Sequence, residues 1–378
     1  MKKVISCFSP KGSPNRNRTG NSPRSSQSPP TPVSSSSSAP ASPSASTSAT
    51  TLARINELTA EAETLNLNLG PLPIQKFPFM QLHFATDGFS AENCVAKGGF
   101  GRVYRGNLAP QNQEVAIKCL DPKSQQGTRE FVTEVEFLSN ADHENIVRLI
   151  GYCAENEHRM IVYEYIRMGS LEAHLLTRNP DLNLAVLDWN TRVRIAYETA
   201  KGLQYLHSNM QPRRIYRDLK CANILLGEGY TVKLSDFGCA KKAPANERER
   251  NLTRVLGTVG YLDPAYFTTG NCTVQNDIHS FGVVLLELVT GRKCIDERRP
   301  TEEQSLLIWA RRVFGNRDRY EEIVDPLLNG NFNERSLHAL VRMAEYCVNS
   351  DSMKKPKMSH IVDILGQLNR AADEPNIP

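Results

Sequence analysis

Three polar residues near the middle of the chain have the types and spacing that phosphoryl transfer requires. Asp218, Lys220 and Asn223 fall within six residues, between the apolar Ile215 and an apolar run that begins at Ile224. A carboxylate there can orient a hydroxyl nucleophile, an ammonium can neutralise phosphate charge, and an amide oxygen can ligate a metal ion. A polar surface turn is the plainer interpretation, but it does not explain why both ends of the loop are apolar.

A lysine and a glutamate further upstream are predicted to form a buried ion pair. Glu134 lies three residues after Phe131 and four before Leu138, so it shares the apolar stripe of a helix expected over 127–140. A carboxylate turned towards a protein core needs a cationic partner. Lys118, at the end of a strand-like segment, is the natural partner, although a single lysine at a strand end more often reaches out to solvent.

A glycine cluster, Gly98, Gly99 and Gly101, precedes this pair. Closely spaced glycines let backbone N–H groups approach phosphate oxygens, because no Cβ intervenes. The next residues, 102–105, alternate like a strand, whereas the glycines of a dinucleotide-binding fingerprint lead into a helix. No G-K-[ST] triplet follows, so a P-loop is excluded as well. A tight turn, or a glycine-rich hairpin that covers phosphates, remains.

The elements that must position these residues change in kind along the chain. Short strands are expected first, with one helix among them, and mostly helices follow. This order predicts an α+β fold, with a small β-rich lobe joined to a larger α-helical lobe and a ligand cleft between them. The expected strands are 94–95, 102–105, 114–118, 146–152 and 159–165, and the helices are 127–140, 191–206, 277–290, 305–313, 336–347 and 358–368.

The N-terminal part has a different composition. Residues 1–56 hold seven of the 45 basic residues and no acidic one, so the remainder has 45 − 7 = 38 basic against 41 acidic residues. The basic character therefore belongs to a Ser/Pro-rich tail, predicted to be disordered over 1–70, and gives no support for nucleic-acid binding. The globular domain is expected over 77–370, with its lobes at about 77–163 and 167–370 and a short tail at 371–378.

Composition excludes several classes of protein. No apolar run approaches the ~18 residues that a membrane-spanning helix needs. The nine cysteines include no C-x-x-C pair, so neither a disulfide framework nor a zinc site is indicated.

The order of the motifs is far more specific than any one of them. The glycine hairpin, Lys118, Glu134, the R-D-x-K-x-x-N segment and Asp236-Phe237-Gly238 follow one another as they do in eukaryotic protein kinases, which the chain resembles over about 77–368. The sequence segments 169–175, 188–189, 215–218 and 280–284 resemble those of the plant receptor-like cytoplasmic kinases of the receptor-like/Pelle group. The resemblance implies an ATP-dependent serine/threonine kinase that uses Mg²⁺ and relays signals from cell-surface receptors.

The resemblance also implies a role for each matching residue. Asp218 would be the catalytic base, Lys220 would contact the γ-phosphate, and Lys118 would hold the α- and β-phosphates. Mg²⁺ would be held by Asn223 and Asp236. The remaining ATP-binding positions are Val95, Gly98, Gly99, Gly101, Val103, Ala116, Glu164 and Ile166, with Tyr163 as gatekeeper.

Regulatory positions follow from the same resemblance. Thr258 would help to orient Asp218, and Arg217 would pair with a phosphate carried by Thr253 in the activation loop. A regulatory spine would stack Leu138, Leu149, Tyr216 and Phe237.

Three residues depart from the family pattern. Ala96 replaces the first loop glycine, which predicts weaker ATP binding. Ala265 and Lys355 stand where the family has a buried Glu–Arg pair, so that pair is expected to be lost, with Lys355 neutral or reaching solvent and the activation segment looser. These departures leave a second function open, a catalytically weak or inactive pseudokinase that serves as an adaptor in a receptor or immune complex.

The expected partners are a protein substrate with serine or threonine and an upstream receptor kinase, without nucleic acid. A cytoplasmic location is expected, and Lys2 after Met1 excludes N-myristoylation. Acylation of Cys7 beside Lys2 and Lys3 would add peripheral attachment at the inner face of the plasma membrane. An ordinary disordered tail and a plastid transit peptide are the alternatives.

Overall fold

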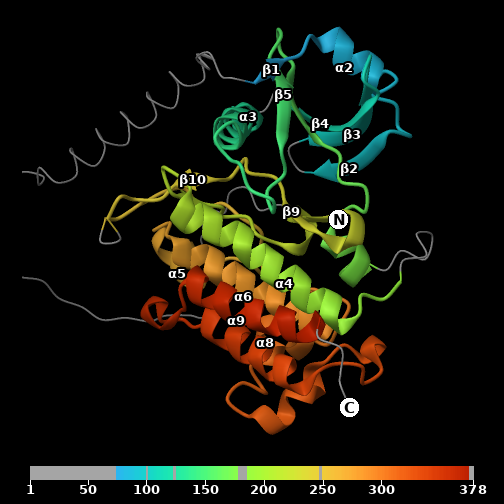
Figure 1. Cartoon of the computed structure of the whole chain (residues 1–378). Helices are drawn as coiled ribbons and strands as arrows, with labels where there is room; N and C mark the ends of the chain where they lie inside the picture. The colour runs from blue at the N-terminus through green and yellow to red at the C-terminus, as the bar shows by residue number, and fades with distance from the viewer. Residues whose placement is uncertain (1–73, 99–100, 122–124, 178–184, 247–248, 374–378) are drawn as a thin grey trace, which may run out of the picture. The chain divides into compact units, whose positions relative to one another are not determined.

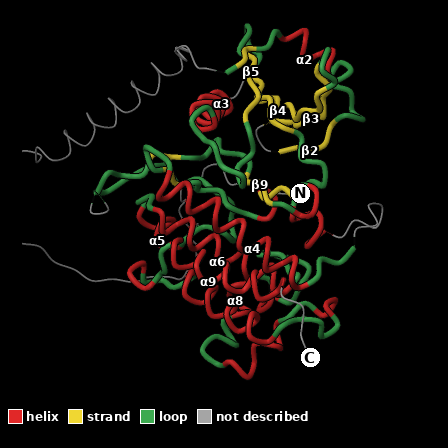
Figure 2. The backbone as a smooth tube through the Cα atoms, in the orientation of Figure 1, coloured by secondary structure: helices red, strands yellow, loops and turns green. Residues whose placement is uncertain are grey.

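The computed structural model describes residues 74–98, 101–121, 125–177, 185–246 and 249–373. The predicted tail over 1–70, its Cys7, Gly99 and the last five residues lie outside these ranges. The predicted order of strands followed by helices is confirmed: strands gather in one part of the described chain and helices in the other (Figure 2).

A six-stranded sheet forms the first part, in the order β1-β5-β6-β4-β3-β2. Neighbouring strands are antiparallel except β1, which runs parallel to β5. The tight pairing of Gly98 with Gly101 closes the β2–β3 hairpin, and a Cβ at Gly101 would lie 2.0 Å from the carbonyl oxygen of Cys119. The strands are β1 (Gln75–Lys76), β2 (Cys94–Gly98), β3 (Gly101–Leu108), β4 (Gln113–Leu120), β5 (Leu149–Cys153) and β6 (Arg159–Glu164).

Two helices pack on this sheet. The helix α3 (Gln125–Leu138) lies against β4, β5 and β6 and buries the predicted stripe of Phe131, Val135 and Leu138 (Figure 1). A second helix, α2 (Phe79–Ala85), packs near β3 and was not predicted from the sequence. Leu82 is its only fully buried residue and lies in the sheet's apolar core. A single inward-facing residue in two turns gives too weak an apolar periodicity to predict a helix.

The helical part is organised around α6 (Val274–Thr290). This helix is apolar on nearly all sides and contacts α4, α7 and α8, as expected for a helix in the centre of a core. A Thr273/Asn276 capping box begins it, and Gly291, with φ of 61°, ends it in the left-handed conformation. The other helices are α4 (Trp189–Gln204), α5 (Pro264–Thr269), α7 (Leu306–Ala310), α8 (Glu334–Cys347) and α9 (Met358–Asp373).

Short elements connect the two parts. Ile146, predicted to begin a strand of the sheet, instead pairs with Leu234, so β5 begins only at Leu149. The small strands are β7 (Arg214–Ile215), β8 (Ile224–Leu226), β9 (Val232–Leu234) and β10 (Lys241–Lys242). The short 3₁₀ and π turns are η1 (Ala173–Thr177), η3 (Tyr205–Asn209), η4 (Cys221–Asn223), η5 (Glu228–Tyr230), η6 (Thr301–Glu303), η7 (Arg317–Ile323), η8 (Pro326–Leu328) and η9 (Ser352–Lys354).

None of the described helices combines the length and the apolar character that crossing a membrane requires.

Candidate active site

Lys118 is shared by two carboxylates from different parts of the chain. Its Nζ lies 2.7 Å from Glu134 Oε2 on α3 and 2.6 Å from Asp236 Oδ1 after β9. The other oxygen of Glu134 accepts a hydrogen bond from the backbone N–H of Phe237, at 3.0 Å. The sheet, α3 and the segment after β9 are therefore tied together at one lysine.

Burial and charge act in opposite directions on this triad. Burial disfavours the Lys118 ammonium, but the carboxylates of Asp236 and Glu134 raise its pKa well above its ordinary value. Burial raises the pKa of Glu134 against the attraction of Lys118, whereas the ammonium keeps the pKa of Asp236 low. The Asp236 side chain is 43% exposed and that of Glu134 is not exposed at all. Asp236 is thus the carboxylate available to a ligand.

Asp218 is held on both oxygens. Thr258 Oγ1 donates to Asp218 Oδ1 at 2.6 Å, and Lys220 Nζ donates to Oδ2 at 2.6 Å and to Thr258 Oγ1 at 2.9 Å. Asn223 Nδ2 donates to the backbone oxygen of Asp218 at 2.9 Å and to its Oδ2 at 3.2 Å. The two loops that carry Asp218 and Thr258 are thus joined at the carboxylate that would accept a proton.

The residue pattern fits a nucleotide and a metal ion. Asn223 donates both hydrogen bonds to Asp218 through its amide nitrogen, and no hydrogen bond among the described residues occupies its amide oxygen. This oxygen and the Asp236 carboxylate are hard donors of the kind that Mg²⁺ prefers. On the sheet, Val95 is an apolar side chain left 48% exposed on β2. An exposed apolar residue beside a glycine hairpin suits contact with an adenine ring.

The other predicted nucleotide contacts lie on neighbouring strands. Ala116 is opposite Tyr163 in the β4–β6 ladder, and Val103 is opposite Lys118 in the β3–β4 ladder. Glu164 ends β6; its side chain lies 2.9 Å from Lys233, and its backbone N–H donates to the backbone oxygen of Arg148 at 3.1 Å. Ile166 follows β6 and is partly buried.

A buried aspartate anchors the loop that carries Asp218. Asp277 on α6 accepts hydrogen bonds from the backbone N–H groups of Tyr216 and Arg217, each at 2.8 Å, and contacts the ring of His207 at 2.8 Å. These bonds hold Arg217 at a left-handed φ of 71°, which is uncommon for a residue with a Cβ. The sequence interpretation missed this role of Asp277, although the residue lay in the helix expected over 277–290.

Arg217 also reaches the segment that contains Thr253. Its Nη1 lies 3.4 Å from Thr253 Oγ1, and its Nε donates to the backbone oxygen of Cys239. The structure therefore places the two predicted regulatory residues side by side.

Aromatic rings stack on Phe237. The Tyr216 ring lies 4.8 Å away between centroids, and its hydroxyl donates to the backbone oxygen of Ser235. The ring that α3 contributes is Phe137, stacked at 4.3 Å, and this residue was missed from the sequence. The predicted spine residue Leu138, next to it, is buried as well.

A Glu–Arg pair at positions 265 and 355 is absent, as expected, but the prediction that Lys355 reaches solvent is wrong. The Lys355 side chain is 1% exposed, and its Nζ donates to Asp263 Oδ2 and, at 3.3 Å, to the backbone oxygen of Gln275. Asp263 is the N-cap of α5, and its other oxygen accepts from the backbone N–H of Ala265 at 2.8 Å. Asp263, two residues before Ala265, is thus the partner of Lys355, and the lysine remains paired inside the protein.

Known proteins share this arrangement of residues. Residues 89–365 match the family described as "Protein tyrosine and serine/threonine kinase". The chain is 46% identical over 329 residues to "Probable serine/threonine-protein kinase PBL5" of Arabidopsis thaliana, covering 85% of this chain and 76% of the relative. It is 48% identical over 299 residues to "Probable serine/threonine-protein kinase PBL26", covering 79% and 72%. It is 45% identical over 308 residues to "Serine/threonine-protein kinase PBS1", covering 82% and 67%; both relatives are also from Arabidopsis thaliana.

Proposed function

Because the chain belongs to the family of protein tyrosine and serine/threonine kinases, we propose that it transfers the γ-phosphoryl group of ATP to serine and threonine residues of other proteins. The resemblance to plant receptor-like cytoplasmic kinases is confirmed by 45–48% identity to relatives of this type over most of the chain. The kinase domain is proposed to span 77–370.

The observation that carries the proposal is the network at Asp218. A general base must reach the substrate hydroxyl and keep its own orientation, and both oxygens of Asp218 are already held by Thr258 and Lys220. Burial opposes the Lys220 ammonium, but the neighbouring Asp218 carboxylate raises its pKa, so the cation persists beside the transferred phosphate. A lysine at this position, hydrogen-bonded to a threonine, supports serine and threonine as acceptors.

The remaining roles follow from the same geometry. Lys118 would bind the α- and β-phosphates, and the Asp236 carboxylate and the Asn223 amide oxygen would hold Mg²⁺, which neutralises phosphate charge during transfer. Gly98, Gly99 and Gly101 would cover the phosphates. The adenine ring would lie between Val95, Val103 and Ala116, with its edge on the backbone of residues 164–166.

A pseudokinase adaptor is the second candidate, and Ala96 is the observation that favours it. Ala96 pairs with Val103 on the β2–β3 hairpin, where a glycine was expected. The buried Lys355–Asp263 pair, however, removes the argument for a loose activation segment. We therefore place phosphotransfer first.

We further propose that the kinase acts downstream of a receptor kinase at the cell surface. Arg217 lies beside the hydroxyl of Thr253, so phosphorylation of Thr253 would put a phosphate within reach of a guanidinium. This arrangement suits a kinase that is switched on by another kinase. Attachment to the membrane through an acylated Cys7 belongs to the same proposal.

Phosphotransfer is tested with the purified full chain, Mg²⁺, ATP labelled at the γ-position and a generic basic protein substrate. We expect phosphoserine and phosphothreonine after hydrolysis of the labelled substrate, and no labelling by the Asp218→Asn variant. Labelling that survives in this variant, or no labelling by the wild type while ATP still binds, would support the adaptor instead.

A further inference from the structure

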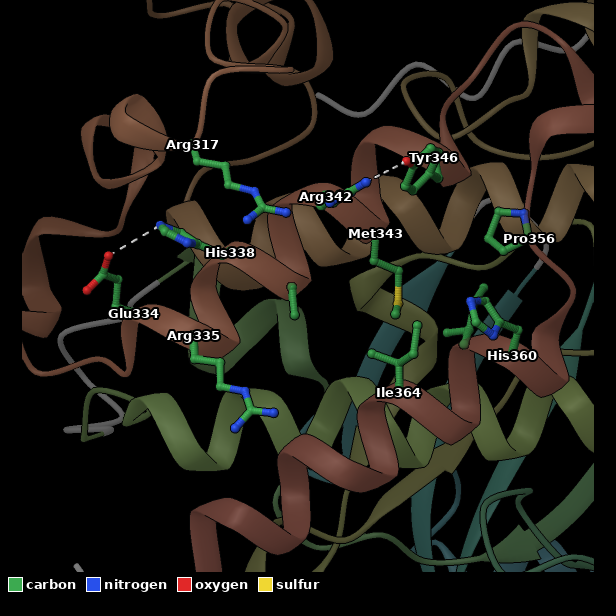
Figure 3. Close-up of a pocket in the computed structure, with 12 residues that line it drawn as sticks. Arg317, Glu334, Arg335, His338, Arg342, Met343, Tyr346, Pro356, His360 and Ile364 are labelled. Carbon is green, nitrogen blue, oxygen red and sulfur yellow. Dashed lines mark hydrogen bonds and ion pairs between the residues drawn. The ribbon is translucent and has the colours of Figure 1, made fainter.

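A groove on the helical part of the molecule lies apart from the residues assigned to phosphotransfer. It runs between α8 and α9 beside η7 and has a volume of about 690 Å³, within the range of pockets that take a ligand or several peptide side chains (Figure 3). We call it the α8–α9 groove and define it by Arg317, Arg335, Arg342, Met343, His360 and Ile364.

The rim of the groove is cationic. Three arginines and two histidines line it, against a single glutamate, Glu334. Glu334 lies 3.8 Å from the ring of His338, and no carboxylate in the described ranges pairs with Arg317, Arg335 or Arg342. Guanidinium groups without a carboxylate partner around a hollow favour an anionic occupant.

The floor of the groove is apolar. Met343 is 5% exposed and Ile361 is fully buried, and the partly buried Ile364 continues this surface along α9. In Figure 3, Arg317, His338 and Arg342 lie on one side of Met343, and His360 lies on the other. An occupant therefore meets an apolar strip with the guanidinium groups of Arg317 and Arg342 on one of its sides.

An aromatic side chain stands at the edge. Tyr346 is 44% exposed, its hydroxyl accepts a hydrogen bond from Arg342 at 3.1 Å, and the guanidinium lies 5.6 Å from the ring centre. Tyrosine and arginine are the residue types that dominate binding energy at protein interfaces, and Arg342 is already oriented here by its neighbour.

We propose that the α8–α9 groove binds a short acidic segment of a partner protein, in which aspartate and glutamate residues flank aliphatic or aromatic ones. The apolar side chains would cover Met343 and Ile364, and the carboxylates would form forked hydrogen bonds with Arg317, Arg335 and Arg342. This occupant matches both the charge of the rim and the chemistry of the floor.

Other occupants match less well. An anionic membrane surface would reach the rim, but a flat bilayer cannot contact a recessed floor at Met343. The chain's own N-terminal segment has seven basic and no acidic residues over 1–56, so the rim would repel it. A second copy placed symmetrically would bring one arginine rim against another.

The proposal is tested by selecting peptides on the full chain. A random peptide library displayed on phage is selected on the wild type after depletion on Arg335→Glu/Arg342→Glu, a variant of two exposed residues outside the phosphotransfer site. We expect enriched peptides rich in Asp and Glu around Leu, Ile or Phe. A synthetic copy should bind the double variant at least about tenfold more weakly, while the variant's phosphotransfer rate stays that of the wild type.

Matched controls separate the groove from general charge. Lys76→Glu/Arg148→Glu makes the same change of net charge at two exposed residues, one in β1 and one directly before β5, and should bind the peptide as the wild type does. Arg342→Gln, which keeps a polar side chain, repeats the measurement if the double variant does not fold. Enriched peptides without acidic residues, equal binding of the double variant, or groove-dependent binding of phosphatidylserine vesicles without binding of the peptide would each overturn the proposal.

Discussion

Lys355 pairs with Asp263, two residues before the position at which related kinases carry a glutamate. The pair is fully buried, and Asp263 also accepts the backbone N–H of Ala265 at the start of α5. One carboxylate thus begins a helix and neutralises a buried ammonium. The start of α5 is therefore held to the loop before α9 by a buried charge pair.

Removing one partner of this pair should destabilise the protein strongly. Lys355→Met leaves the Asp263 carboxylate buried without its cation, a change that costs about 3–5 kcal/mol in comparable pairs. Urea unfolding of the variant at neutral pH measures this loss. Asp263→Asn, which still accepts from Ala265, serves as the second corner of a double-mutant cycle, and a coupling energy below about 0.3 kcal/mol would mean that the two side chains do not interact.

His279 gives an independent readout of the same variant. Burial lowers the pKa of His279 to about 4, with Lys355 and Arg311 lowering it further and Asp263 opposing them. In Lys355→Met one of the lowering charges is gone and Asp263 remains, so the pKa of His279 should rise. NMR titration of the imidazole detects the change, and an unaltered titration would contradict the assigned contact.

Lys118→Met should abolish phosphotransfer and also weaken the fold. Removing a cation that stabilises the negative charge on the phosphates in the transition state lowers the phosphotransfer rate by about 100-fold or more. The variant also leaves Glu134 buried without a cation, so the folded pKa of this acid rises further above its ordinary value. A raised folded pKa means that the native state binds more protons than the unfolded state, and stability then falls as the pH rises.

The deficit of Lys118→Met relative to wild type should therefore grow as the pH rises past the folded pKa of Glu134 in the wild type, which is itself raised above the ordinary value of 4.5. Urea unfolding at several pH values checks this. Near wild-type labelling of a substrate by Lys118→Met would contradict the role of the lysine, and a deficit independent of pH would contradict the role of Glu134.

Thr253→Ala should lower the activity of the phosphorylated kinase. A charge-assisted hydrogen bond such as one from Arg217 to a Thr253 phosphate contributes about 1.5–3 kcal/mol, which corresponds to about tenfold or more in rate if it orders the active state. Thr268→Ala is the matched control, because Thr268 also follows the catalytic loop but its hydroxyl bonds to the backbone oxygen of Pro264. If the two variants are equally active after incubation with ATP, phosphorylation of Thr253 does not activate the kinase and this part of the proposal is wrong.

Local patterns predicted the parts of the site that depend on short-range order. Glu134 was placed by its spacing from Phe131 and Leu138, and the structure has it 2.7 Å from Lys118. The Asp263–Lys355 contact was not predicted, because it depends on the fold bringing Asp263 to a lysine 92 residues away. A proline directly after Asp263 did indicate a helix start, and a capping carboxylate there was the usable clue.

The same difference between local patterns and long-range contacts explains which parts of the fold were predicted. The ends of α4 and α8 shifted by only about two residues from the predicted bounds, because Asp188 and Asn333 cap them with side-chain oxygens that local sequence specifies. Ile146 was predicted to lie in a strand of the sheet but pairs with Leu234 instead. Tertiary contacts, and not local sequence, determine this pairing. Asp277 was missed for a similar reason, since its three hydrogen bonds go to residues at least 60 positions away.

A buried carboxyl under the site makes stability depend on pH. Glu287 on α6 has no exposed surface and accepts from the Cys221 thiol at 3.0 Å, the Tyr261 hydroxyl at 2.7 Å and the backbone N–H of Cys294 at 2.9 Å. Burial raises its pKa from 4.5 to about 7, although these three hydrogen bonds lower it and Glu172 adds to the rise. The carboxyl links the loop of Asp218 to the segment after Thr258 without a cation beside it.

Glu287→Gln should remove this dependence. The folded pKa is raised, so the native state takes up a proton that the unfolded state lacks, and the wild type loses stability as the pH rises from about 4.5 to 7. The loss is at most about 3–4 kcal/mol, since each pKa unit of the rise from 4.5 to about 7 corresponds to about 1.4 kcal/mol. An amide does not titrate. Between about pH 5 and pH 8 the unfolding free energy of Glu287→Gln should therefore rise relative to that of the wild type by up to that amount.

Glu130, whose pKa burial also raises to about 7, is the control. Glu130→Gln should change the pH dependence of the unfolding free energy independently, so that its effect adds to that of Glu287→Gln. A difference between Glu287→Gln and wild type that stays constant over this range would show that the carboxyl does not titrate there, and that its hydrogen bonds hold it ionised throughout.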